Sequence, residues 1–155
     1  MFRHALKFFG AALTAFLTAC TTTGPLFEGV TPAAAGKCVV YIYYVSEITF
    51  LDSGPPPLYI DNERVARLDT DRYVRRELTC DPHRFQIAEF KNFYLSFLVY
   101  SSANLTLREG SPAFLKITGK RVGGEYSGLG RPVWSFKYPD DATALSELKK
   151  MRAIK

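Results

Sequence analysis

A thiol, a carboxylate and an imidazole fall within four residues of this chain, in the stretch Cys80-Asp81-Pro82-His83. These groups suit nucleophilic catalysis, which needs a base within hydrogen-bond reach of the thiol, or metal binding, which needs three or four ligands. A turn at the proline directs the side chains of Cys80 and His83 apart, which argues against a catalytic dyad. The chemistry left to Cys80 depends on whether the surrounding compartment is oxidising.

The first twenty residues indicate that compartment. A short basic region precedes an apolar run over residues 8–17. That run is about half as long as the roughly 20 residues that a membrane-spanning helix needs. This arrangement is typical of a secretory signal peptide, so we predict a helical signal peptide over residues 1–19. The apolar run ends in Leu17-Thr18-Ala19-Cys20, which resembles the lipobox of bacterial lipoproteins.

The lipobox resemblance implies cleavage before Cys20 and attachment of palmitate or related acyl chains to that residue, which makes a stable membrane anchor. Thr21 stands where a signal for retention in the inner membrane usually places aspartate. By the same resemblance, the outer membrane is favoured, with the protein facing the periplasm. The alternative is an ordinary signal peptide whose cleavage site lies near a cysteine.

The rest of the chain divides into a linker and one domain. Residues 20–37 are rich in Thr, Pro, Gly and Ala, and are predicted to be a lipidated flexible tether. Residues 38–155 have the length of one domain. The net charge is +5, and removal of Arg3 and Lys7 with the signal peptide leaves +3. Because this excess is mild and spread along the chain, we expect no nucleic-acid partner. The expected partners are the membrane, through the anchor, and another envelope protein.

An oxidising envelope also changes the prediction for Cys80. Two cysteines on neighbouring strands would form a disulfide there, so we predict a Cys38–Cys80 bridge. Two free buried thiols are one alternative, and a metal site that adds His83 is another. His83 is the single histidine after the predicted cleavage site. We expect no metal, no cofactor and no enzymatic activity.

Pairs of carboxylates could serve a glycan hydrolase. Asp69 and Asp71 lie in a connection between two predicted strands, whereas Asp140 and Asp141 are predicted to cap a helix. Residues 121–131 are rich in glycine, but they lack the Lys-Ser/Thr pair of a phosphate-binding loop. We therefore predict a surface loop there and no hydrolase.

Aromatic residues make up 14% of the chain, more than a core of this size requires. Some of them could therefore lie at the surface, where they would stack on sugars or anchor a partner protein. Tyr126, Arg131 and Trp134 lie in and after the Gly-rich loop, and we predict a contact surface there because loops often carry function. The alternative is that alternate tyrosines lie in the core and the others line a covered sheet face.

Dense β-branched and aromatic runs, with turn residues every 8–12 positions, predict a mainly β fold. We expect a β-sandwich of about seven to eight short antiparallel strands. The main strands are predicted over 38–45, 73–78, 83–90, 93–100, 113–118 and 133–138. Residues 58–68 are predicted to form a hairpin that turns at Asp61-Asn62-Glu63. The helical spacing of apolar residues after Asp140 predicts one C-terminal α-helix of about three turns.

The order of these motifs resembles a family of small bacterial envelope lipoproteins known only as a domain of unknown function and related to PEGA-type modules. The motifs are VVYIYYV, LYIDNERVARL, YVRRELTCDPHRFQI, LTLREGSPAFLKITG and DDATALSELKKM. The chain departs from the family pattern at Asp61-Asn62, where Asp-Gly is usual, at Asp81-Pro82-His83, where Pro-Gly-x-His is usual, and at Phe114, where Tyr is usual. The resemblance implies a β-sandwich and no particular activity. An interaction or accessory module is thus the leading hypothesis, and a binder of glycan or peptidoglycan fragments is the alternative.

Overall fold

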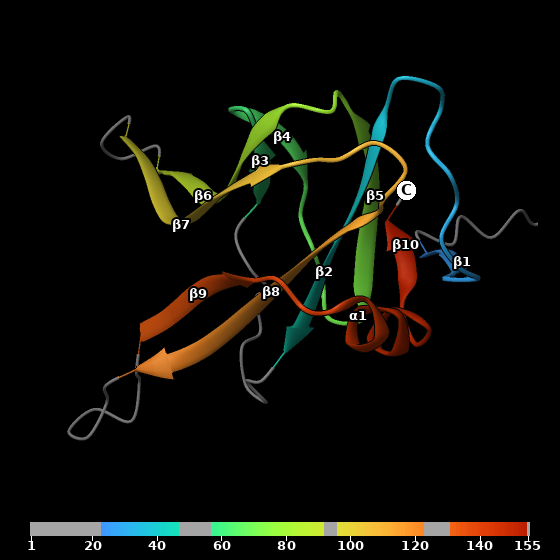
Figure 1. The fold of residues 1–155 in the computed structure, drawn as a ribbon. Helices are drawn as coiled ribbons and strands as arrows, with labels where there is room; N and C mark the ends of the chain where they lie inside the picture. The colour runs from blue at the N-terminus through green and yellow to red at the C-terminus, as the bar shows by residue number, and fades with distance from the viewer. Residues whose placement is uncertain (1–22, 47–56, 92–95, 123–130, 155) are drawn as a thin grey trace, which may run out of the picture.

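The computed structural model describes residues 23–46, 57–91, 96–122 and 131–154 (Figure 1). The predicted signal peptide, the predicted lipidation residue Cys20 and the predicted contact residue Tyr126 lie outside these ranges. Within the described part of the chain, none of the helices is both long enough and apolar enough to cross a membrane.

The described residues form two sheets and one helix (Figure 1). The six-stranded sheet has the order β1-β10-β5-β2-β8-β9. Its strands are β1 (Thr23–Leu26), β10 (Arg152–Ile154), β5 (Arg72–Leu78), β2 (Cys38–Ser46), β8 (Ala113–Val122) and β9 (Arg131–Lys137). The four-stranded sheet has the order β4-β3-β6-β7. Its strands are β4 (Glu63–Ala66), β3 (Leu58–Ile60), β6 (Pro82–Lys91) and β7 (Ser96–Thr106). The prediction of a mainly β fold is confirmed.

The number and direction of the strands differ from the prediction. The described residues contain ten strands instead of seven to eight. Two pairings are parallel, β2 with β8 and β10 with β5. The sequences Thr-Gly-Pro-Leu in β1 and Arg-Ala-Ile in β10 are too short to show the alternation that identifies a strand. Strand direction depends on tertiary pairing, so no local pattern predicted the parallel pairs.

The two sheets pack face to face through one hydrophobic core, as in a β-sandwich. Val40, Ile42 and Tyr44 of β2 point into this core and are at most 1% exposed. Phe85 and Ile87 of β6 meet them from the four-stranded sheet, and both are fully buried. The disulfide-bonded Cys38 belongs to the same cluster.

A second hydrophobic cluster covers the other face of the six-stranded sheet. Tyr41 and Tyr43 of β2 point to this face and are at most 1% exposed. Ala144 and Leu148 of the helix cover them together with Phe27, which follows β1. Both faces of β2 are therefore buried, which explains its uninterrupted apolar sequence.

The helix α1 (Asp141–Leu148) begins where the sequence predicts it. Asp140 is the N-cap and accepts a hydrogen bond from the backbone nitrogen of Thr143 at 2.9 Å. The helix is shorter than the predicted three turns, because the backbone nitrogen of Arg152 donates to the carbonyl of Asp71. That bond directs the last residues into β10, so sheet pairing overrides the helical spacing.

Candidate functional site

The disulfide predicted from the sequence is present between Cys38 and Cys80. It joins the first residue of β2 to the turn that follows β5, and the two Cα atoms are 5.2 Å apart. In the antiparallel pairing of these strands, Cys38 lies opposite Leu78, two residues before Cys80. The thiol of the Cys80–His83 stretch is thus consumed in a structural bond, which removes it as a nucleophile or metal ligand.

His83 is buried and both of its ring nitrogens have partners. Nδ1 lies 2.6 Å from Oδ2 of Asp61, and Nε2 lies 3.0 Å from the carbonyl oxygen of Thr79. The Asp61 carboxylate also accepts a hydrogen bond from the backbone nitrogen of Arg84 at 2.9 Å. Asp61 and Asn62 have φ angles of 51° and 70°, which confirms the predicted turn between β3 and β4. The imidazole therefore connects the β3–β4 turn to the turn that carries Cys80.

The partners of His83 favour its protonated form. Burial alone would lower the pKa of the imidazole, but the hydrogen bonds to Asp61 and Thr79 outweigh burial and raise that pKa above its usual value. Burial acts against the charged form of Asp61 as well, yet the backbone of Arg84 and the imidazole of His83 lower the pKa of this carboxyl. The two groups thus form an ion pair at acidic to neutral pH.

Replacing His83 by glutamine is expected to lower the free energy of unfolding by about 1–2 kcal/mol at pH 5.5. Because the pKa of His83 is raised in the folded state, its contribution is complete below the unfolded pKa of about 6.5 and is lost as the pH rises through the folded value. The contribution of Asp61, whose pKa is lowered, is lost instead as the pH falls through its folded value. Urea unfolding of the wild-type and His83→Gln proteins between pH 5.5 and 8.5 measures the difference.

Asp61→Asn is the matched control, because asparagine tolerates the left-handed backbone at this turn. It is expected to remove the same pH-dependent part of the stability. A destabilisation by His83→Gln that is equal at pH 5.5 and pH 8.5 would contradict a charged imidazole.

The segment before β2 contacts the domain along most of its length. β1 pairs with β10, and the backbone nitrogen of Phe27 donates to the carbonyl of Met151 at 3.0 Å. The Phe27 ring is 6% exposed and meets the rings of Tyr41 and Tyr73 edge-on, with centroids 5.5 Å away in each case. The predicted flexible tether over residues 20–37 is therefore wrong for residues 23–37. The β1–β10 pairing, the burial of Phe27 and hydrogen bonds to the backbone of Thr31 and Pro32 together hold this segment against the domain.

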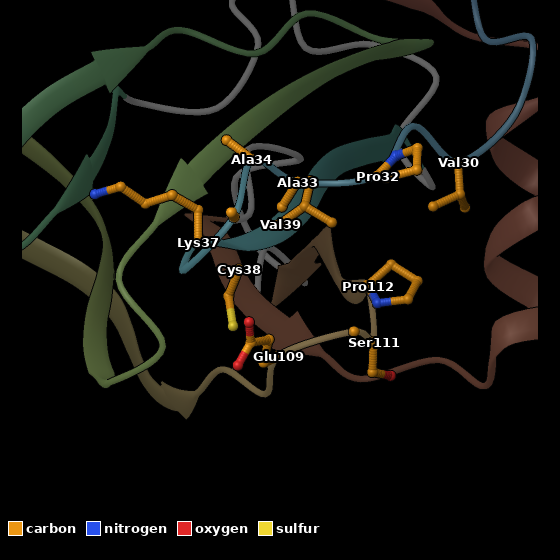
Figure 2. Close-up of a pocket in the computed structure, with 12 residues that line it drawn as sticks. Val30, Pro32, Ala33, Ala34, Lys37, Cys38, Val39, Glu109, Ser111 and Pro112 are labelled. Carbon is orange, nitrogen blue, oxygen red and sulfur yellow. The ribbon is translucent and has the colours of Figure 1, made fainter.

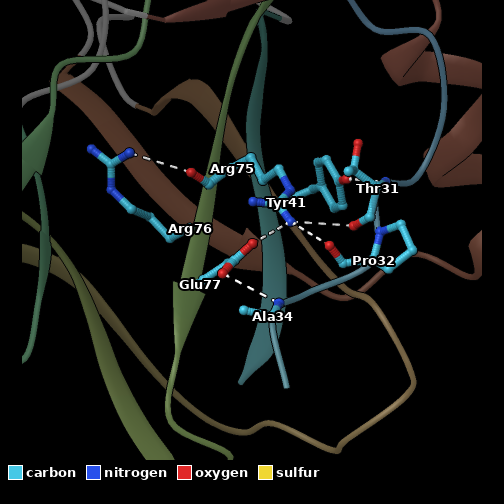
Figure 3. A network of polar contacts seen from close by, with 7 residues as sticks. All are labelled: Thr31, Pro32, Ala34, Tyr41, Arg75, Arg76 and Glu77. Atoms are coloured by element: carbon cyan, nitrogen blue, oxygen red, sulfur yellow. Dashed lines mark hydrogen bonds and ion pairs between the residues drawn. The ribbon is translucent and has the colours of Figure 1, made fainter. Parts of the chain in front are cut away.

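Arg75 of β5 holds the middle of this segment against the sheet (Figure 3). Its guanidinium donates to the carbonyl oxygens of Thr31 at 3.3 Å and Pro32 at 2.9 Å. The same nitrogen lies 2.6 Å from Glu77, whose other carboxylate oxygen accepts from the backbone nitrogen of Ala34. These bonds satisfy backbone groups of a segment that has no neighbouring strand at these positions.

The phenol of Tyr41 completes this polar network, accepting a hydrogen bond from the backbone nitrogen of Thr31 at 2.8 Å (Figure 3). The hydrogen bond from Arg75 and the backbone of Ala34 lower the pKa of the Glu77 carboxyl. Sequence reasoning missed Arg75 and Glu77, since an alternating charged pair on a strand is also typical of a solvated face. Phe27 was the available clue, as a large apolar residue in a segment otherwise rich in small and polar residues.

A cavity of about 300 Å³ lies where this segment approaches the turn between β7 and β8 (Figure 2). Most of its lining is apolar, and Glu109 and Lys37 are its charged residues. Figure 2 shows the Lys37 side chain extending away from the other lining residues. The lining comes from Val30, Pro32, Ala33, Ala34, Ala35, Lys37, Cys38, Val39, Glu109, Gly110, Ser111 and Pro112. Its volume is at the lower end for a ligand pocket and suits an apolar side chain or a small apolar molecule.

Among the described residues, the carboxylate that most resembles a catalytic acid is the half-buried Glu147 on α1. The phenol of Tyr43 donates to it at 2.7 Å, and the ammonium of Lys116 lies 2.5 Å from its other oxygen. Burial opposes the charge, but Lys116 and Tyr43 lower the pKa of Glu147. Both oxygens are thus occupied in joining α1 to β2 and β8, which is a structural role.

Of the three residues in the predicted contact surface, the structure describes the side chain of Trp134, and this side chain is buried. Trp134 is 4% exposed, and its indole packs against the ring of Tyr44 with centroids 5.7 Å apart. A Cβ atom at Gly119, directly opposite on β8, would overlap this indole. The prediction of Trp134 as a contact residue is therefore wrong: glycine opposite leaves a space in the core that the indole fills. Arg131 is the first residue of β9, and the structure describes its backbone but not its side chain.

The aromatic residues of β2 follow the alternative in which tyrosines alternate between covered faces. Tyr44 lies in the core between the sheets, whereas Tyr41 and Tyr43 lie under the helix and the N-terminal segment. Tyr138, which follows β9, is 55% exposed. Packing therefore accounts for the three tyrosines of β2.

In the described part of the chain, no group of three or more histidine, cysteine, aspartate or glutamate side chains could hold a metal ion. Of the predicted structural carboxylates, Asp140 caps α1 and Asp71 bonds Arg152 through its backbone. Asp69 lies exposed before β5. Asp61 and Glu63 both line a second cavity, of about 320 Å³, beside β3, β4 and β5, where Asp61 is paired with His83.

No protein-family model matches the chain, and comparison with the curated proteins and with the solved structures finds no match to it. The resemblances to the lipobox and to the PEGA-related envelope lipoproteins stay predictions.

Proposed function

We propose that the protein is a lipid-anchored interaction or accessory module of the bacterial cell envelope, without catalytic activity. The observation that carries the proposal is the sequence Leu17-Thr18-Ala19-Cys20 at the end of a short apolar run that follows a basic region. The Cys38–Cys80 disulfide supports it, since such bonds persist in oxidising compartments and are rare in the cytosol. The similarity in motif order to PEGA-related envelope lipoproteins agrees with the same role.

The interaction role follows from what the described residues offer to a partner. The cavity between residues 30–37 and the β7–β8 turn is mostly apolar, and the imidazole of His83 and the carboxylate of Glu147 are paired within the fold. Such a surface can receive an apolar side chain of a partner protein, with Glu109 and Lys37 as the charged groups beside it.

The glycan-binding alternative depends on exposed aromatic side chains. Four of the aromatics that could have served it are in the core, namely Tyr41, Tyr43, Tyr44 and Trp134. Among the side chains that the structure describes, Tyr138 is the one aromatic ring that is largely exposed, and one such ring favours no sugar site over a protein contact. We therefore place the interaction module first.

Fractionation of a double-membrane bacterium that expresses the protein tests the anchor. Wild-type protein is expected to incorporate labelled palmitate and to sediment with the outer membrane. Cys20→Ser should lose the label, because the acylated sulfur is absent. Thr21→Asp is the matched control: it should keep the label and move to the inner membrane. A Cys20→Ser protein that keeps the label would contradict the proposal.

A further inference from the structure

The fold begins much closer to the proposed lipid anchor than a flexible tether would allow. β1 begins at Thr23, three residues after Cys20. Three residues extend at most about 10 Å. Because β1 pairs with β10 at the edge of the six-stranded sheet, this edge is held within that distance of the acylated residue. The domain therefore has little freedom to stand clear of the membrane.

The side chains at this edge suit a lipid surface. Leu26 of β1 is 46% exposed and lies opposite Arg152 of β10. Lys149 and Lys150 are exposed and directly precede Met151, whose carbonyl bonds the backbone of Phe27. Within the described part of the chain, none of the three cations forms an ion pair with a carboxylate. Arg152 donates to the backbone carbonyl of Gly24 at 3.5 Å, and the charge of Lys150 helps to lower the pKa of the Glu147 carboxyl. An exposed apolar side chain beside cations that form no salt bridge is the composition of an interfacial membrane contact.

We propose that the β1–β10 edge is a membrane-contact surface, with Leu26 at the boundary between headgroups and acyl chains and with Lys149, Lys150 and Arg152 on lipid phosphates. The inference rests on the proposed anchor at Cys20. It also orients the domain. β9 lies five strand spacings from β1 in the sheet, which is about 24 Å. Figure 1 shows β9 and the end of β8 on the side away from β1, so this end projects from the membrane towards partners.

Fluorescence quenching by brominated lipid tests this orientation on the full, processed protein in vesicles. The vesicles contain phosphatidylcholine brominated high on its acyl chains and about one third phosphatidylglycerol. Leu26→Trp places an indole at the proposed contact. Val122→Trp is the matched control, because Val122 is 43% exposed and lies on β8, four strand positions from β1. Trp134 is common to both variants.

Quenching at Leu26→Trp is expected to exceed that at Val122→Trp by at least threefold. Charge reversal at Lys149, Lys150 and Arg152 should reduce the Leu26→Trp quenching severalfold, whereas Lys120→Glu with Lys137→Glu should leave it unchanged. Equal quenching of the two indoles in acylated protein would overturn the inference alone. A protein mass without acyl chains would contradict the anchor and the inference together.

Discussion

Replacing both Cys38 and Cys80 by alanine is expected to lower the free energy of unfolding by about 4 kcal/mol. The bond closes a loop with a sequence separation of 42, and in the chain-entropy account its loss frees that loop in the unfolded state. Such a loss is a large share of the 5–15 kcal/mol that stabilises an ordinary domain. The Cys80 turn also places His83 against Asp61, so the variant loosens the β3–β4 turn as well.

Urea unfolding with and without a reductant measures this effect. Reduced wild-type protein should unfold near the midpoint of the double variant, and the double variant should not respond to reductant. Thiol counting on the unreduced, unfolded wild-type protein should find neither Cys38 nor Cys80 reactive. A wild-type protein whose two cysteines react freely would show that the bond does not form.

Phe27→Ala is expected to destabilise the protein by about 3–5 kcal/mol, the range for truncating a buried aromatic ring. The ring is 6% exposed and contacts Tyr41 and Tyr73 on the outer face of the six-stranded sheet. Its loss would open a cavity under the N-terminal segment and weaken the attachment of β1. Leu26→Ala is the matched control, because the neighbouring side chain is 46% exposed and its truncation should cost less than about 0.5 kcal/mol.

Thermal and urea unfolding of the two variants give the comparison. A difference between Phe27→Ala and Leu26→Ala shows that the segment before β2 is part of the cooperative fold. Equal, near-zero effects would mean that residues 23–37 behave as a tether. In that case the short link between Cys20 and the fold would be lost, and with it the reason for a membrane contact at β1.

Local patterns predicted the elements that depend on local chemistry. The uninterrupted apolar sequence over residues 38–45 predicted the strand β2, and both faces of this strand are buried. Asp61 and Asn62 predicted the β3–β4 turn because few other residues adopt positive φ there. Asp140 predicted the start of α1 through its capping oxygen. In each case one or a few neighbouring residues determine the backbone.

The remaining features depend on contacts between residues far apart in the chain. β1 and β10 become strands only by pairing with each other and with β5. Trp134 is buried because Gly119 lies opposite it on another strand, whereas its place after a Gly-rich loop suggested exposure. The pairing of His83 with Asp61 spans 22 residues, so the sequence identified both residues without showing that they meet.

In the candidate site, too, some features could be predicted from the sequence, whereas those that depend on contacts between distant residues could not. The Cys38–Cys80 bridge could be predicted, since the proposed compartment and two strand-associated cysteines left few alternatives. The cavity could not be predicted, because it forms between the β7–β8 turn and a segment, residues 30–37, that was expected to be a flexible tether. The role of Arg75 could not be predicted either, because its guanidinium donates to the carbonyl oxygens of Thr31 and Pro32, which are far from it in the sequence.

The intact mass of the mature protein, purified from the envelope of its host in detergent, tests directly whether Cys20 is the lipid anchor. We expect the mass of residues 20–155 with a diacylglyceryl group and a further acyl chain on Cys20, and with two hydrogens missing for the Cys38–Cys80 bond. A chain that retains residues 1–19, or one that begins near residue 20 without acyl chains, would contradict it.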